Sequence, residues 1–84
     1  MLDENTIRNA ARETASEIVG RSVSDGQRLI SSGLIDSLSI LKLIGSLEKK
    51  LHIKISTDGL QPDDLDDVQL ITETVQRVAR PAAD

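Results

Sequence analysis

The sequence predicts a small all-α fold, in which three main helices and one short helix form a bundle with a long loop between the first two. Three segments space their apolar residues three and four positions apart, the period of one helix face. A residue that favours helix caps stands before each segment. Only one short run alternates between apolar and polar residues, and no second run is there to pair with it.

The first helix is expected over residues 4–19. Its apolar face consists of Ile7, Ala10, Ala11, Ala15, Ile18 and Val19. Asp3 is placed to cap the start, and Glu4 lies against the positive end of the helix dipole. Gly20 suits the left-handed residue that closes a helix.

The second helix is expected over residues 37–51. Its main stripe consists of Ile40, Leu43, Ile44, Leu47 and Leu51. Leu38 and Leu41 widen this stripe. The cap is either Asp36 or Ser37, since both residue types accept a hydrogen bond from a first-turn amide.

The third helix is expected over residues 66–79, where the periodic positions are Val68, Ile71, Val75, Val78 and Ala79. Asp66 is its predicted cap, with Gln69 completing a capping box and Leu65 packing on Leu70 as a hydrophobic staple. Pro81 forbids much continuation. We therefore expect one domain over residues 1–84, ordered over about residues 4–79, with a frayed tail at 80–84.

Two connections remain. The alternating run at 51–55 is expected to be an extended loop, and residues 56–64 to hold one short helical turn. The connection at 20–36 has about 16 residues, and loops of this length are usually functional or disordered. Its four large aliphatic residues are expected to anchor it on the core: Leu29, Ile30, Leu34 and Ile35.

Composition limits the function. Leu, Ile and Val supply 25 of the 84 residues, enough for one small core. The chain has no Cys, which excludes disulfides and thiolate nucleophiles, and no aromatic residue on which bases could stack. A net charge of −4 has the wrong sign for nucleic acid. No apolar run is long enough for a membrane span or a signal peptide, so we expect a cytoplasmic protein.

Catalytic motifs are nearly absent from the sequence. His52 is the single histidine, and we interpret it as a polar residue at the end of the second helix. The glycines match no phosphate-binding loop. Five acidic residues do not follow the spacing of a calcium loop and are interpreted as a solvated face with a helix cap: Asp58, Asp63, Asp64, Asp66 and Asp67. No metal site and no enzymatic activity are expected.

Ser37 is the one position of interest, at the junction of the long loop and the second helix. Taken alone, it is a capping serine. Its context is Gly33-Leu34-Ile35-Asp36-Ser37-Leu38, followed by an aliphatic helix that ends in Leu47-Glu48-Lys49-Lys50-Leu51, then Ile53 and Ile55, a Pro62 turn, and Leu65, Val68 and Ile71. This order resembles the acyl carrier protein and peptidyl carrier superfamily over about residues 4–78.

The resemblance implies a right-handed bundle and a covalent cofactor. Ser37 matches the serine to which a phosphopantetheinyl transferase attaches 4′-phosphopantetheine from coenzyme A, as a phosphodiester. The cargo, an acyl or aminoacyl group, then rides as a thioester on the terminal thiol of the arm. Asp36 matches the acidic neighbour that transferases recognise, and Leu38 and Leu41 offer apolar contacts to partners. The implied partners are the transferase, an acyl- or aminoacyl-activating ligase and downstream acyl-transferring enzymes, with the carrier acting as a monomer.

Two residues depart from the family pattern. Lys42 stands near a place where carriers of bacterial fatty-acid synthesis have a prominent acid, and a reversed charge changes the choice of partner. This favours a specialised or secondary-metabolic pathway over housekeeping fatty-acid synthesis. Leu51 replaces a Phe that is frequent in the family, and we interpret it as repacking of the core rather than a cargo cavity. The alternative function is a non-catalytic helical interaction module in which Ser37 is only a helix cap.

Overall fold

The computed structural model describes residues 2–82, and within them the predicted all-α bundle is confirmed, with a small two-stranded sheet added to it. The elements in chain order are α1 (Glu4–Val19), α2 (Ser37–Leu51), β1 (Ile53–Ile55), the 3-10 helix η1 (Pro62–Leu65), α3 (Val68–Val78) and β2 (Ala79–Pro81). The helical turn η1 supplies the short fourth helix that the sequence predicts within residues 56–64, and it extends one residue beyond that range, to Leu65.

The ends of α1 follow the sequence prediction. The Asp3 carboxylate accepts a hydrogen bond from the Thr6 amide at 2.7 Å and caps the helix. Gly20 ends it with φ 87°, a left-handed conformation that glycine adopts without a steric penalty. The helix is therefore fixed at both ends by its own local sequence.

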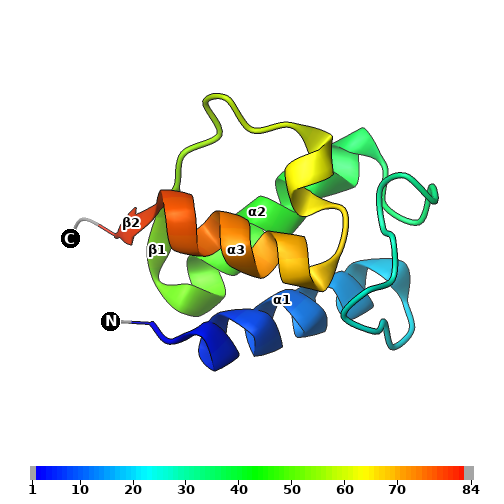
Figure 1. Ribbon diagram of the computed structural model, residues 1–84, viewed down its shortest axis with the longest axis horizontal. Helices are drawn as coiled ribbons and strands as arrows, with labels where there is room; N and C mark the ends of the chain where they lie inside the picture. The colour runs from blue at the N-terminus through cyan, green and yellow to red at the C-terminus, as the bar shows by residue number, and fades with distance from the viewer. Residues whose placement is uncertain (1, 83–84) are drawn as a thin grey trace.

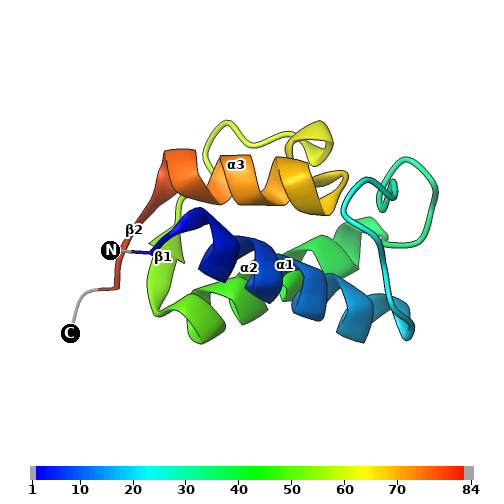
Figure 2. The same ribbon diagram turned by 60° about the horizontal axis from the view of Figure 1, so that its bottom comes forward.

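The core lies where the three main helices meet. Figures 1 and 2 show α1 lying against both α2 and α3, with the long loop at one end of the bundle and β1 and β2 at the other. The fully buried side chains come from all three helices and the loop: Ala11, Ala15, Leu29, Leu43, Val68 and Ile71. Removing this aliphatic surface from water is the main force that stabilises the bundle.

The prediction of an extended loop at 51–55 was wrong. Ile53–Ile55 forms β1, which pairs antiparallel with β2, so that Ile55 lies opposite Ala79 and Ile53 opposite Pro81. Arg80 and Pro81, which the sequence assigned to a frayed tail, belong to β2; residues 83–84 lie outside the described residues. The partner strand is only three residues long, contains a proline and lacks alternation, so the sequence carried no strand signal there.

The predicted start of the third helix was also wrong. Asp67, not Asp66, caps α3, because its carboxylate accepts a hydrogen bond from the Leu70 amide at 2.7 Å. The predicted capping box and staple both depended on a cap at Asp66 and do not apply. Gln69 instead accepts a hydrogen bond from Arg8 of α1 at 2.7 Å and so joins two helices.

The loop between α1 and α2 is anchored on the core, as predicted. Leu29 and Ile35 are buried, and Ile30 and Leu34 are half-buried against the same cluster. Arg12 of α1 holds the near side of the loop through two hydrogen bonds to the Asp25 carboxylate, at 2.8 and 3.1 Å. The loop thus has a defined shape up to the first residue of α2.

Candidate functional site

Ser37 is the first residue of α2 and is exposed to solvent. The sequence offered Asp36 and Ser37 as alternative caps of this helix. In the structure the cap is Asp36, whose carboxylate accepts a hydrogen bond from the Ser39 amide at 2.9 Å. The Ser37 hydroxyl therefore takes no part in the capping bond. It stands on the first turn of a helix whose amino-terminal amides and dipole favour a negative charge.

Asp36 is itself exposed and remains charged at neutral pH. The hydrogen bond from the Ser39 backbone amide is the main reason that the pKa of the Asp36 carboxyl lies below its ordinary value. A fixed negative charge therefore directly precedes the Ser37 hydroxyl. An enzyme that approaches Ser37 meets this carboxylate at the same helix end.

Leu38 and Leu41 lie next to Ser37 on the exposed side of α2. Their side chains are 80% and 66% exposed, although both are large and apolar. Lys42 is also exposed, and Leu41 and Lys42 follow Leu38 by three and four positions, which places the three residues on one helix face. The structure thus brings the predicted recognition residues together beside Ser37.

The other charges of α2 are mostly engaged within the domain. Glu48 accepts a hydrogen bond from the Ile55 amide of β1 at 2.9 Å. Lys50 lies 2.7 Å from Glu13 and 3.0 Å from Glu17 of α1, and these two carboxylates outweigh burial and raise the pKa of Lys50. Lys42 and Lys49 remain as exposed charges on α2, so its outward face is basic.

The sequence interpretation missed the role of Asp66. The acidic cluster was interpreted as a solvated face with a helix cap, and Asp66 as that cap, but Asp66 is 6% exposed and its Oδ1 accepts hydrogen bonds from the amides of Leu29, Ile30 and Ser31. The signal in the sequence was the Asp66-Asp67 pair before one helix, because a helix needs only one capping side chain. Asp67, also buried, is that cap.

Two hollows lie along α2. The smaller, of about 170 Å³, lies between α2 and the segment before and within η1, and its lining includes Ile40, Leu41, Leu60 and Leu65. Its volume is below the roughly 300 Å³ at which small-molecule pockets usually begin. It lies within two turns of Ser37, because Ile40 and Leu41 follow Ser37 at positions three and four of the helix.

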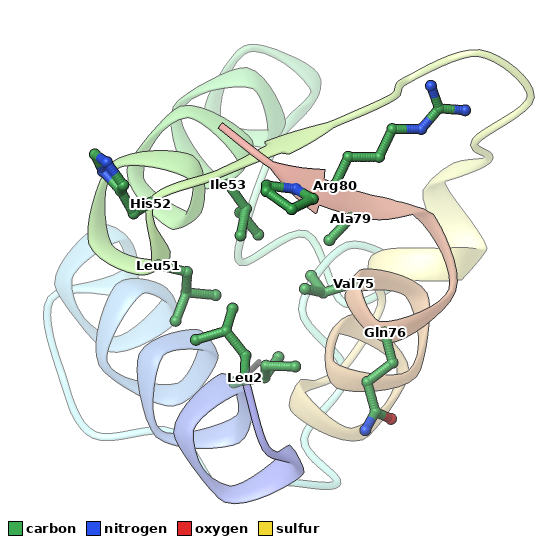
Figure 3. Close-up of a pocket in the computed structure, with 10 residues that line it drawn as sticks. Leu2, Leu51, His52, Ile53, Val75, Gln76, Ala79 and Arg80 are labelled. Carbon is green, nitrogen blue, oxygen red and sulfur yellow. The ribbon is translucent and has the colours of Figure 1, made fainter. Parts of the chain in front are cut away.

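The larger hollow, of about 850 Å³, is at the far end of the bundle. Figure 3 shows Leu2, Leu51, Val75 and Ala79 around an apolar space, whereas the Arg80 side chain extends away from it. Ser37 and Leu51 are the first and last residues of α2, 14 helical steps or about 21 Å apart. The space beside Leu51 is thus remote from Ser37.

Other kinds of site find little support in the described residues. Residues 2–82 bring together no group of three His, Asp or Glu side chains that could hold a metal ion. None of the helices in this part of the chain combines the length and apolar character that crossing a bilayer requires. His52 is the exposed residue that ends α2, with φ 57°, and lies at the opposite end of α2 from Ser37.

Residues 36–38 fit a covalent phosphate-linked group. A phosphodiester on an exposed first-turn serine is placed at the positive end of the α2 dipole, where first-turn amides favour an anion. Because Asp36 supplies the cap, modification of Ser37 leaves the capping bond in place. Leu38 follows Ser37 directly in the chain, and its exposed side chain presents apolar surface at the same helix end.

Comparison with known families gives a match over nearly the whole chain. The family model described as the phosphopantetheine attachment site matches residues 6–78. Comparison with curated proteins returned no significant match. This family is defined by the covalent attachment of 4′-phosphopantetheine, its members are generally non-catalytic, and they are modified by phosphopantetheinyl transferases and interact with biosynthetic enzymes. The chain therefore belongs to the phosphopantetheine-binding family of acyl and peptidyl carrier proteins.

Proposed function

We propose that this chain carries an acyl or aminoacyl group on a 4′-phosphopantetheine arm attached to Ser37. The observation that carries the proposal is the division of roles at the start of α2. Asp36 makes the capping bond, and the exposed Ser37 hydroxyl is left for modification. When attached, the cofactor supplies the thiol that holds the cargo as a thioester.

The roles of the neighbouring residues follow from their positions. Asp36 presents a fixed carboxylate to the transferase, and Leu38 and Leu41 present apolar surface to it and to later partners. Large apolar side chains this exposed are typical of interaction surfaces. Lys42 adds a positive charge on the same face. Ser37 is then the attachment site for the arm, at the end of a rigid helix. The partner enzymes catalyse the activation and transfer of the acyl group.

The basic face of α2 supports a specialised pathway. Lys42 and Lys49 are exposed, and Glu48, the single acid of α2, is bonded to β1. Such a face is complementary to partners with acidic docking surfaces and disfavours basic ones. We infer that the activating ligase and the acceptor enzymes differ from those of housekeeping fatty-acid synthesis.

Two observations count against the alternative of an interaction module that uses Ser37 as a cap. The cap is Asp36, and two of the five acids in the stretch 58–67, Asp66 and Asp67, are buried and bonded within the domain. They offer no acidic surface to a basic partner. An interaction module also requires no modification of Ser37, and the two functions are therefore separable by experiment.

A thiol assay tests the proposal, and the unmodified protein gives no signal in it. The chain has no Cys, so a maleimide reagent labels it only after phosphopantetheine has been attached. We expect one reactive thiol per chain after incubation with coenzyme A and a broad-specificity transferase, and none when the transferase is omitted. Folded chain that acquires no thiol with several transferases would exclude the carrier function.

A further inference from the structure

Asp66 clamps the loop that leads to Ser37 from a distant part of the chain. Its Oδ1 lies 2.8 Å from the Ile30 amide, 2.9 Å from the Ser31 amide and 3.2 Å from the Leu29 amide. The Leu29 amide also donates to the Asp66 carbonyl at 2.7 Å. Three successive amides that converge on one oxygen form a nest for a carboxylate. The clamp spans 35–37 positions of sequence.

The clamped residues are connected directly to the start of α2. The Leu29 carbonyl accepts a hydrogen bond from the Ile35 amide at 2.8 Å, and the Ile30 carbonyl accepts one from the Gly33 amide at 3.0 Å. Ile35 immediately precedes the cap Asp36 and the serine Ser37. The loop therefore forms a closed turn between the Asp66 carboxylate and the first residue of α2.

The charge on Asp66 is retained despite burial. Burial raises the pKa of the Asp66 carboxyl, but the hydrogen bonds from the three loop amides outweigh it and hold the pKa below its ordinary value. Arg28 stands 3.6 Å from Asp66 Oδ2, which adds a compensating positive charge. Hydrogen bonds to a charged acceptor are stronger than neutral ones, so the clamp needs the carboxylate and not merely an oxygen.

Asp67 provides a natural control for this clamp. It is the neighbouring residue, equally buried, and its Oδ2 lies 3.8 Å from the same Arg28 guanidinium. Its carboxylate bonds the Leu70 amide at the start of α3 rather than the loop. The two aspartates are thus similarly buried and lie near the same guanidinium. They differ in the amides that they bind: Asp66 binds amides of the loop, and Asp67 binds an amide of α3.

We propose that Asp66 is a positioning residue for the modification of Ser37: it fixes the 28–35 loop in the shape that presents Asp36, Ser37 and Leu38 to the transferase. This inference rests on the proposed carrier function. Without the hydrogen bonds to Asp66, the loop populates other conformations. The apparent affinity of the transferase for the chain then falls in proportion to the fraction of molecules that keep the binding-competent conformation. The turnover of bound, correctly shaped chains is unchanged.

The test compares Asp66→Asn with Asp67→Asn as substrates of the transferase, well below their unfolding temperatures. For Asp66→Asn we expect KM to rise about tenfold with kcat within about twofold of wild type. For Asp67→Asn, and for the more destabilised Asp67→Ala, we expect both constants to stay within about twofold of wild type. Equal KM values for Asp66→Asn and wild type, or a KM that rises with lost stability in all three variants, would overturn the proposal.

Hydrogen exchange gives a second readout that needs no transferase, and its wild-type measurement needs no variant. In the wild-type chain the amides of Ile30, Ser31 and Ile35 should exchange slowly, and in Asp66→Asn faster, with the Leu70 amide unchanged. Exchange of Ile30 and Ser31 at the rate of an unstructured peptide in the wild type would refute the clamp. A wild-type chain that accepts no phosphopantetheine would refute the carrier function itself, and with it this inference.

Discussion

The Asp36 carboxylate accepts a hydrogen bond from the Ser39 amide at 2.9 Å, across the exposed Ser37. This bond begins α2 and places a charge directly before the hydroxyl that we propose as the attachment point. Asp36 thus combines a capping oxygen with a charge: substitution by Asn removes the charge alone, and substitution by Ala removes both.

Substitution of Asp36 tests these two properties. Asp36→Ala should lower the urea concentration at the midpoint of unfolding, because the cap is lost. Asp36→Asn keeps a good capping side chain and should unfold at nearly the same urea concentration as wild type. Both variants should be modified more slowly, because both lack the charge. Urea unfolding followed by circular dichroism gives the stabilities, since the chain has no aromatic reporter. Asp36→Asn modified at the wild-type rate would show that the transferase does not use the charge.

The exposed leucines of α2 should matter for partners and not for folding. Leu38→Ala and Leu41→Ala should change the free energy of unfolding by less than about 0.5 kcal/mol, because both side chains are exposed. Leu43→Ala, on the buried side of the same helix, should lower it by about 3 kcal/mol. Transfer kinetics should show a higher KM for the Leu38 and Leu41 variants. Unchanged kinetics in both would remove these residues from the docking surface.

Reversal of the charge at Lys42 should change the choice of partner. Lys42→Glu is expected to speed association with enzymes that dock through basic surfaces, such as those of fatty-acid synthesis, by about tenfold at low salt, and the effect should fade as salt rises. Lys54→Glu is the matched control, because Lys54 is exposed on β1, at the far end of α2 from Ser37. Equal rates for wild type and Lys42→Glu would argue against a role of Lys42 in partner choice.

Cargo should stay outside the core. The hollow beside Ile40 and Leu41 is small, and the larger one beside Leu51 lies about 21 Å along α2 from Ser37. Attachment of a short acyl group should therefore leave the methyl chemical shifts of Leu51 and Val75 unchanged. Solution spectra of loaded and unloaded protein give the answer, and shifts at both residues on loading would indicate that the cargo enters that hollow.

Acid should weaken the domain through Asp66. The ordinary aspartate pKa is 3.8 and that of Asp66 in the folded chain is lower, so the unfolded chain binds the proton first as the pH falls. The stability that Asp66 contributes is complete above 3.8 and is lost as the pH falls from 3.8 toward the folded pKa. Wild type should exceed Asp66→Asn by about 2 kcal/mol at neutral pH. The difference should shrink in acid, and one that stays constant down to about pH 2.5 would contradict the argument.

The features that depend on local sequence were predictable. The apolar periodicity of α1 and α2, the cap at Asp3 and the end at Gly20 are each set by residues within one or two turns. The place of Ser37 at a helix start was predictable from local sequence, whereas its role as an attachment point came from a resemblance that covers about residues 4–78. The predictions that were wrong concerned residues whose partners lie far along the chain. β1 pairs with residues about 26 positions later, and Asp66 accepts hydrogen bonds from amides about 36 positions earlier.

Buried threonines are a further case that local patterns did not reveal. Thr14, Thr72 and Thr74 are buried within the helices, although their type favours caps and turns. The Thr72 hydroxyl donates to the Val68 carbonyl one turn earlier, and Thr74 donates to the Asp64 carbonyl of η1, both at 2.8 Å. In Thr72 and Thr74 the hydroxyl is bonded to the backbone and the methyl group is free to pack in the core, whereas the buried Thr14 hydroxyl has no hydrogen-bond partner among the described residues. Hydrophobic spacing alone counts such positions as polar.

The most direct test of the account is the intact mass of three proteins after incubation with coenzyme A and a broad-specificity phosphopantetheinyl transferase. They are wild type, Ser37→Ala and Ser39→Ala, the last keeping the backbone amide that Asp36 caps. We predict that wild type and Ser39→Ala each gain the mass of one phosphopantetheine and that Ser37→Ala gains none. Modification of Ser37→Ala, or of none of the three while they are folded, would contradict the account.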